Sequence, residues 1–234
     1  MNIIITGASR GIGYQVVKAF AEDKDNNILA IARNKPALNE LKRTCRSEGL
    51  HGKVFSLPYD LGTPELEKGL EPRINAYFSH VDLLINIAGT MVNKPFFELN
   101  DQDFDALFNV NVRSVFKLCQ IVTKLMKPGA HIINVSSMGG FQGSTKFPGL
   151  SLYSSSKGAV SILSECLAEE LKPAGISVNC LALGAVQTEM LEEAFPGYEA
   201  KIDPYAMSRF IKAFASGGQL FMNGKVLPVS PSVP

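Results

Sequence analysis

Short apolar runs alternate with mixed polar and apolar segments along the whole chain. The runs are rich in β-branched residues, as is typical of strands buried on both faces of a parallel sheet. They predict strands at residues 2–6, 28–32, 53–57, 81–86, 130–135 and 176–182, and a turn with a last strand at 221–227. The intervening segments predict helices at 14–21, 38–47, 63 to about 78, 103–126 as a short helix and a longer one, 152–172 and 204–215.

This alternation has no break, internal repeat or linker. It predicts an α/β fold in which residues 1–234 form a single domain, a Rossmann-type doubly wound parallel sheet of about seven strands with helices on both faces. The 46% hydrophobic content is enough for a sizeable core. Residues from about 188 to 210 have mixed character and contain Pro196-Gly197, so we expect a mobile substrate lid there.

Composition narrows the classes of partner. A net charge of +1 gives no reason to expect nucleic acid or an anionic membrane. No apolar run reaches the roughly 20 residues that span a bilayer, and the first strand starts at Asn2, which leaves no room for a signal peptide. The cysteines are scattered, without metal-ligand or disulfide spacing, so we expect no metal site and a reducing, cytoplasmic location; they are Cys45, Cys119, Cys166 and Cys180.

A glycine-rich turn joins the first strand to the first helix. Its sequence is Gly7-Ala8-Ser9-Arg10-Gly11-Ile12-Gly13. Glycines allow a tight turn and a close approach of the backbone to a pyrophosphate, and the helix N-terminus offers unpaired N–H groups. The turn lacks the Gly-Lys-Ser/Thr ending of a P-loop, so we predict a dinucleotide site instead of a nucleoside triphosphatase.

The end of the second strand bears on the choice of cofactor. Enzymes that prefer NAD usually have an acid there, which binds the ribose 2′-OH. This chain has Ala32 followed by Arg33, and Arg10 lies in the glycine turn. These residues favour the 2′-phosphate of NADP over NAD, although Arg33 also fits a plain surface charge. Asp60, at the end of the third strand, fits an adenine contact and a turn aspartate about equally.

Tyr153 and Lys157 form the candidate acid–base pair. Residues four apart lie on one face of a helix. A nearby ammonium favours the phenolate, so Lys157 is expected to lower the tyrosine pKa from about 10 toward the working pH. Tyr14 and Lys18 have the same spacing, and for them we favour a solvated helix face.

Three polar positions complete the candidate site. Asn111 lies in an apolar helix, where asparagine is unfavourable, so it indicates either a specific polar role or a hydrogen bond to a loop. Asn86 ends the fourth strand, and Ser136-Ser137 end the fifth. His131 lies at the opposite end of the fifth strand, so we expect it to be structural.

Together these motifs resemble the short-chain dehydrogenase/reductase family over nearly the whole chain. Those that carry the resemblance are Thr6 to Gly13, Asp60-Leu61, Asn86-Ile87-Ala88-Gly89, Asn111, Ser136-Ser137, Tyr153 to Lys157, and Leu183-Gly184-Ala185-Val186-Gln187-Thr188.

The resemblance implies a role for each residue. Tyr153 would be the acid/base on the substrate oxygen, and Lys157 would lower its pKa and hold the nicotinamide ribose. Ser137 would bind the carbonyl, and Asn111 would hold a water in a proton relay. The implied NADP(H) site comprises Gly7, Ser9, Arg10, Gly11, Ile12, Gly13, Arg33, Asp60, Leu61, Asn86, Ala88, Gly89, Tyr153, Lys157, Gly184, Val186 and Thr188.

The chain departs from the family pattern in several places. Ile87 replaces a second asparagine, Leu183 replaces a proline, the loop from Ser137 to Tyr153 is longer than usual, and the C-terminal segment lacks Asp-Gly-Gly. The apolar pocket candidates suggest a hydrophobic ketone or aldehyde, with a 3-oxoacyl thioester or a pterin side-chain ketone as options; they are Met138, Phe141, Phe147, Leu183, Met190 and Leu191.

Two other classes of protein remain possible. A catalytically silent cofactor-binding sensor or scaffold would not need the complete set of catalytic residues. A Rossmann-type methyltransferase would usually have an acid near Ala32, and it would leave Tyr153 and Lys157 without a role. The family resemblance also implies a homodimer or homotetramer formed through helices 111–126 and 152–172.

Overall fold

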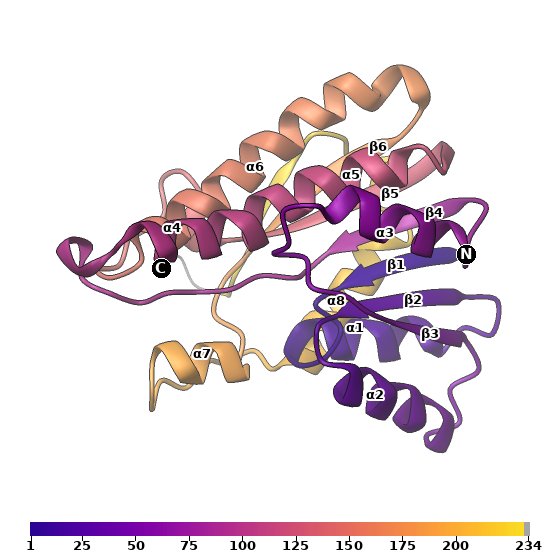
Figure 1. Ribbon diagram of the computed structural model, residues 1–234, viewed down its shortest axis with the longest axis horizontal. Helices are drawn as coiled ribbons and strands as arrows, with labels where there is room; N and C mark the ends of the chain where they lie inside the picture. Colours follow the sequence, from indigo (N-terminus) through magenta and orange to yellow (C-terminus); the bar gives the residue numbers. More distant parts are fainter. Residues whose placement is uncertain (232–234) are drawn as a thin grey trace.

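The computed structural model describes residues 1–231, which form one seven-stranded parallel sheet. The strand order is β3-β2-β1-β4-β5-β6-β7, so the direction of winding reverses between β1 and β4 (Figure 1). Ligands bind outside the carboxyl ends of the strands at such a reversal. The strands are β1 (Asn2–Thr6), β2 (Asn27–Ala32), β3 (Lys53–Pro58), β4 (Val81–Asn86), β5 (Met126–Ser137), β6 (Ser177–Leu183) and β7 (Val226–Val229).

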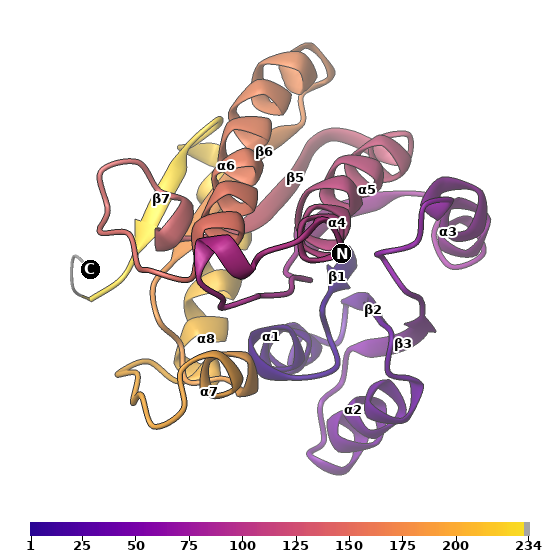
Figure 2. The same cartoon turned by 60° about the vertical axis from the view of Figure 1, so that its left-hand side comes forward.

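Helices cover both faces of the sheet (Figure 2). One face packs against α1 (Gly11–Ala21), α2 (Lys35–Ser47) and α8 (Pro204–Ala215). The other packs against α3 (Leu66–Asn75), α5 (Ser114–Thr123) and α6 (Ser151–Leu171). Two shorter helices, α4 (Asp101–Phe108) and α7 (Glu189–Ala194), lie in the connections that follow β4 and β6. The predicted doubly wound fold is therefore confirmed.

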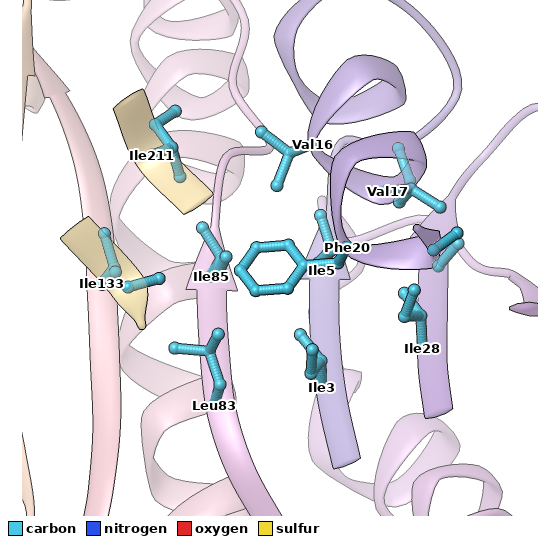
Figure 3. Close-up of a cluster of buried hydrophobic side chains, with 14 of the residues drawn as sticks. Ile3, Ile5, Val16, Val17, Phe20, Ile28, Leu83, Ile85, Ile133 and Ile211 are labelled. Carbon is cyan, nitrogen blue, oxygen red and sulfur yellow. The ribbon is translucent and has the colours of Figure 1, made fainter. Parts of the chain in front are cut away.

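The alternation of side chains along the strands divides the core into two layers. Ile3 and Ile5 of β1 face α1, whereas Ile4 faces the opposite layer. Phe20 of α1 lies over Ile5 and Ile85, and all three side chains are fully buried (Figure 3). Burial of a side chain of this size stabilises a protein by about 1.5–3 kcal/mol, so this layer holds α1 and its glycine turn on the sheet.

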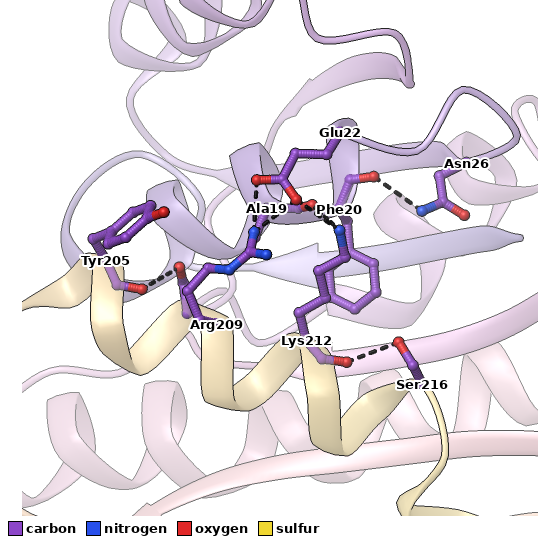
Figure 4. A network of polar contacts seen from close by, with 9 residues as sticks. Ala19, Phe20, Glu22, Asn26, Tyr205, Arg209, Lys212 and Ser216 are labelled. Atoms are coloured by element: carbon purple, nitrogen blue, oxygen red, sulfur yellow. Dashed lines mark hydrogen bonds and ion pairs between the residues drawn. The ribbon is translucent and has the colours of Figure 1, made fainter.

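An ion-pair cluster fixes α8 beside α1. The Glu22 carboxylate accepts hydrogen bonds from Arg209 at 2.6 Å and from Lys212 at 2.9 Å (Figure 4). Lys212 also donates to the backbone carbonyl of Ala19 at 2.7 Å. These contacts join the segment after α7 to the helix that carries the glycine turn.

Some predicted boundaries were wrong. Residues 103–126 divide into α4, a π-helical turn at Asn109–Arg113, and α5, and β5 begins at Met126 instead of residue 130. The last strand begins at Val226, after an exposed apolar segment at 220–222. The helix predicted at 204–215 is α8, and its first turns overlap the end of the region proposed as a lid, which stays a prediction.

Two further features concern membrane-spanning helices and metal sites among the described residues. No helix within 1–231 is long and apolar enough to cross a membrane. In the same range no group of three or more His, Cys, Asp or Glu side chains is placed to hold a metal ion. All four cysteines are free thiols.

Candidate active site

A cleft of about 840 Å³ lies at the carboxyl edge of the sheet. It runs from the glycine turn, past the ends of β2 to β6, to α7. All but two of the predicted site residues line it: Gly7, Ser9, Arg10, Gly11, Ile12, Gly13, Arg33, Asp60, Leu61, Ala88, Gly89, Ser137, Tyr153, Lys157, Gly184, Val186 and Thr188. The two exceptions are Asn86 and Asn111, which lie behind the cleft wall.

The glycine turn requires glycine at specific positions. Gly7 and Gly11 have φ angles of +70° and +55°, which are unfavourable for other residues. A Cβ atom at Gly13 would lie 2.2 Å from the carbonyl oxygen of Gly7, which is backbone and cannot move aside. No side chain caps the start of α1. The turn therefore leaves a backbone cradle and helix N–H groups that suit a pyrophosphate.

Tyr153 and Lys157 lie on the first turns of α6 and are buried at the cleft floor. The Lys157 ammonium donates to the backbone carbonyl of Val135 at 2.9 Å. Burial lowers the pKa of Lys157 to about 8. Among residues 1–231 it forms no ion pair with a carboxylate, so burial is not offset by a salt bridge.

The direction of the tyrosine shift corrects the sequence prediction. Burial raises the pKa of Tyr153, and a hydrogen bond with Ser137 lowers it by less. The Lys157 ammonium is directed to Val135 instead, so the expected lowering of the tyrosine pKa by lysine is absent. At neutral pH the phenol therefore keeps its proton and can donate it.

The second Tyr–Lys pair lies outside the cleft, but both residues are partly buried and Tyr14 packs against the core, so this helix face is less solvated than expected. Lys18 donates to Glu48 at 2.7 Å and lies 6.0 Å from the centre of the Tyr14 ring. Neither residue lines the cleft. The same spacing is therefore found in a helix face without a site.

Asn111 occupies the π-helical turn, a distortion that is frequent at functional sites. Its side chain accepts from the Thr90 N–H at 2.8 Å and donates to the Thr90 carbonyl and to Ser156. It thus ties the loop after β4 to α6, directly behind Lys157. A Cβ atom added to Gly89 would lie 3.3 Å from both Asn111 Oδ1 and Lys157 Nζ, so the three residues are adjacent.

The family resemblance placed Asn86 in the NADP(H) site, and in the structure it lies behind the cleft wall instead. Its amide donates to Asn134 at 2.8 Å, and Asn134 donates to Ser164 of α6 at 2.9 Å. This buried chain joins β4, β5 and α6 below the cleft. Sequence reasoning missed Asn134 and Ser164, although a polar side chain in the middle of an apolar strand or helix was a usable signal.

The two predicted phosphate-binding arginines differ in their partners. Arg10 forms a two-pronged ion pair with Glu193 of α7, at 2.5 and 3.3 Å. Arg33 is exposed and forms no ion pair within residues 1–231. It lines both the cleft and an adjoining cavity of about 390 Å³. Asp60 accepts from the Gly62 N–H at 3.0 Å, as a turn aspartate does, and its side chain still borders both cavities.

The end of the cleft beyond Tyr153 is apolar. Five of the six predicted pocket residues line it: Met138, Phe147, Leu183, Met190 and Leu191. Phe141 does not. The sequence did not indicate Met91, Leu150, Phe195 and Tyr198, which also line this end and belong to connecting segments without helical or strand periodicity.

The sequence of residues 1–199 matches the short chain dehydrogenase family. The chain belongs to this family. Among related proteins, carbonyl reductase (NADPH) 2 of Sus scrofa is 36% identical over 194 residues, which cover 81% of this chain and 73% of that protein. The 3-oxoacyl-acyl-carrier-protein reductase of Thermotoga maritima is 32% identical over 194 residues, which cover 81% of this chain and 76% of that protein.

A solved structure supports the fold assignment. The crystal structure of a short chain dehydrogenase from Burkholderia cenocepacia in complex with NADP has a TM-score of 0.88 and 23% identity, covering 99% of this chain and 96% of that chain. As a short-chain dehydrogenase, the chain is an oxidoreductase. Its departures from the family pattern, Ile87 and Leu183, both line the cleft as apolar wall residues.

Proposed function

We propose that this short-chain dehydrogenase uses NADP(H) to interconvert a hydrophobic carbonyl compound and its secondary alcohol. One observation carries the proposal: a buried tyrosine, whose pKa is raised by burial, lies beside Ser137 and one helical turn from Lys157, in the cleft that begins at the glycine turn. The cofactor supplies the hydride, and the protein supplies position and a proton.

The cleft residues fit a dinucleotide. The backbone of the Gly7–Gly13 turn and the start of α1 would hold the pyrophosphate, because no side chain caps the N–H groups at the start of this helix. Arg33 would bind the 2′-phosphate, since it is exposed at the end of β2 and free of ion pairs in the described chain. The name of the Sus scrofa relative, carbonyl reductase (NADPH) 2, agrees with this choice over NAD.

Proton transfer would be the work of Tyr153. With its pKa raised by burial, its hydroxyl is protonated at neutral pH and can give a proton to the carbonyl oxygen during reduction. Ser137, hydrogen-bonded to that hydroxyl, would hold the same oxygen. Lys157 uses one N–H for Val135, which leaves two donors for the cofactor ribose and the proton path. Asn111 would hold α6 and the loop after β4 in place, with a role in the proton relay as a further expectation.

The substrate end supports an uncharged, apolar ligand. The charged residues that line the cleft are Arg10 and Glu189 at the glycine turn, Arg33 and Asp60 near the ends of β2 and β3, and Lys157 beside Tyr153. Apart from Lys157, whose ammonium donates to the Val135 carbonyl, the residues that line the substrate end carry no charge, so an uncharged ligand fits it best. A 3-oxoacyl thioester remains a second candidate, because the Thermotoga maritima relative is named as such a reductase.

Association into a homodimer or homotetramer is part of the proposal. The helices implicated, α5 and α6, expose Phe116 and Ile162, which are 39% and 61% accessible. Apolar side chains of this size on a helix surface favour contact with another chain. A cytoplasmic location remains a prediction from the cysteine pattern.

A substrate screen tests the proposal. NADPH consumption at 340 nm would be followed with aromatic and aliphatic ketones, 3-oxoacyl thioesters, and carboxylated analogues of the same ketones. We expect turnover of the neutral ketones and weaker turnover of the carboxylated ones. Arg33→Ala should weaken NADPH binding and leave NADH binding unchanged. Equal affinity for the two cofactors in the unmodified protein would contradict the choice of NADP.

A further inference from the structure

The short helix α7 is attached to the glycine turn. Its start packs against Gly11, whose added Cβ would lie 3.3 Å from Thr188 and 3.5 Å from Glu189. Glu193 extends this contact through its ion pair with Arg10. No residue of α7 is fully buried, and at its far end the Asn93 side chain donates to the Ala194 carbonyl at 2.9 Å. Figure 2 shows α7 at the edge of the molecule, beside α1.

The Arg10 side chain can pair either with Glu193 or with the 2′-phosphate of a bound NADP(H). The hydrogen bond to Glu193, with the charges of Glu193 and Glu189, raises the pKa of the Arg10 guanidinium, so both carboxylates stabilise its positive charge. Arg10 also lines the same cleft as Arg33, where the 2′-phosphate is proposed to bind. Glu193 occupies the end of the Arg10 guanidinium through both terminal nitrogens, so in this position a phosphate cannot take that end-on two-pronged contact and has only the remaining N–H groups.

We propose that Glu193 is a specificity-determining residue that weakens NADP(H) binding selectively, because it holds Arg10 away from the 2′-phosphate. NAD(H) lacks this phosphate, so its binding does not compete with the ion pair. This inference rests on the proposed NADP(H) site. It adds that the preference for NADPH over NADH is set by competition with α7, in addition to Arg33.

The Arg10–Glu193 ion pair also connects the cofactor site to the substrate end of the cleft. Met190 and Leu191, on the same helix as Glu193, line the apolar end of the cleft. A 2′-phosphate that draws Arg10 from Glu193 therefore removes a contact of a helix that borders the substrate. Arg10 is either paired with Glu193 or released from it, and a ligand shifts this equilibrium only by its difference in affinity for the two states. NADH has no 2′-phosphate at this position, so it does not distinguish them.

Direct binding measurements test the inference. Dissociation constants for NADPH and NADH would be measured by calorimetry for the unmodified protein, Glu193→Gln and Glu199→Gln. Glu199 is an exposed acid on the segment after α7, so it serves as a control for the loss of one negative charge near an anionic ligand. Because exposed ion pairs contribute modestly, Glu193→Gln should tighten NADPH binding about three- to fivefold and leave NADH binding unchanged.

A double-mutant cycle shows whether the effect passes through Arg10. In an Arg10→Ala background, Glu193→Gln should no longer change NADPH affinity, and Glu193→Asp alone should retain part of the competition. Adenosine 2′,5′-bisphosphate and AMP should show the same contrast as NADPH and NADH.

The measurements distinguish failure of the role of Glu193 from failure of the proposed cofactor. An equal change for both cofactors, an equal change in Glu199→Gln, or an effect that persists without Arg10 would overturn the role of Glu193. Equal binding of NADPH and NADH by the unmodified protein and by Arg33→Ala would overturn the proposed cofactor instead. Absence of binding by either cofactor would overturn both.

Discussion

Replacement of Lys157 by methionine should stabilise the cofactor-free protein while it abolishes activity. Methionine has a similar length and no charge. Lys157 is buried beside Tyr153, and in residues 1–231 no carboxylate balances its charge. The positive charge of Lys157 would serve to bind the cofactor ribose, and its burial would lower the stability of the folded chain.

The pKa gives the size of this cost. Its change from 10.5 to about 8 corresponds to about 3 kcal/mol, since one pKa unit is about 1.4 kcal/mol. Below pH 8 the lysine is charged in both the folded and the unfolded chain, so the penalty is complete. Between pH 8 and 10.5 only the unfolded chain is charged, so stability from this group rises with pH and the penalty shrinks. At pH 9 about 2 kcal/mol remains.

Methionine also loses the hydrogen bond to the Val135 carbonyl, which costs about 1 kcal/mol. The expected net gain in the free energy of unfolding is therefore about 2 kcal/mol at pH 7 and about 1 kcal/mol at pH 9. Urea unfolding at one fixed protein concentration, followed by circular dichroism because the chain has no tryptophan, measures both values.

Lys172→Met is the matched control. This lysine follows the end of α6, and its side chain is 67% accessible. Its replacement should change stability by less than about 0.5 kcal/mol at either pH. A Lys157→Met protein that is less stable at pH 7, or whose gain does not decline at pH 9, would contradict the view that an uncompensated charge is buried at this position.

Three further predictions concern other parts of the molecule. Burial lowers the pKa of His131 to about 4, so stability should fall by about 3 kcal/mol as the pH drops from 6.5 to 4, and a smaller fall in His131→Gln would confirm the source. Gly13→Ala should cost about 1–3 kcal/mol in urea unfolding and weaken NADPH binding at least about tenfold, whereas Gly217→Ala, with open space around it, should do neither. Light scattering should find a dimer or tetramer, and a stable monomer at micromolar concentration would refute the proposed association.

Much of the fold was predictable because its signals are local. β-Branched runs gave six of the strands nearly in place, and the glycine turn was specified by backbone geometry that only Gly7, Gly11 and Gly13 accept. The predicted boundaries are less accurate where tertiary contacts determine where a helix or strand begins and ends. The π-helical turn at Asn111 is an example, since its bonds to Thr90 and Ser156 join segments distant in sequence.

The sequence predicted most of the residues that line the cleft, and it predicted their electrostatics less well. Spacing and order placed Tyr153, Lys157 and Ser137 in one cleft. The spacing did not reveal that burial, and not the neighbouring ammonium, governs the pKa of Tyr153. Likewise the sequence of the glycine turn gave no sign that Arg10 would pair with Glu193, a residue 183 positions away.

Tyr153→Phe tests the central claim most directly. The change removes one hydroxyl from a buried ring, so NADPH should still bind with an affinity close to that of the unmodified protein. Without a proton donor, kcat for reduction of the best ketone should fall by about 10²- to 10⁴-fold. Tyr14→Phe, in the pair of the same spacing outside the cleft, should keep full activity. Full activity in Tyr153→Phe, or an equal loss in both variants, would contradict the assignment of Tyr153 as the proton donor.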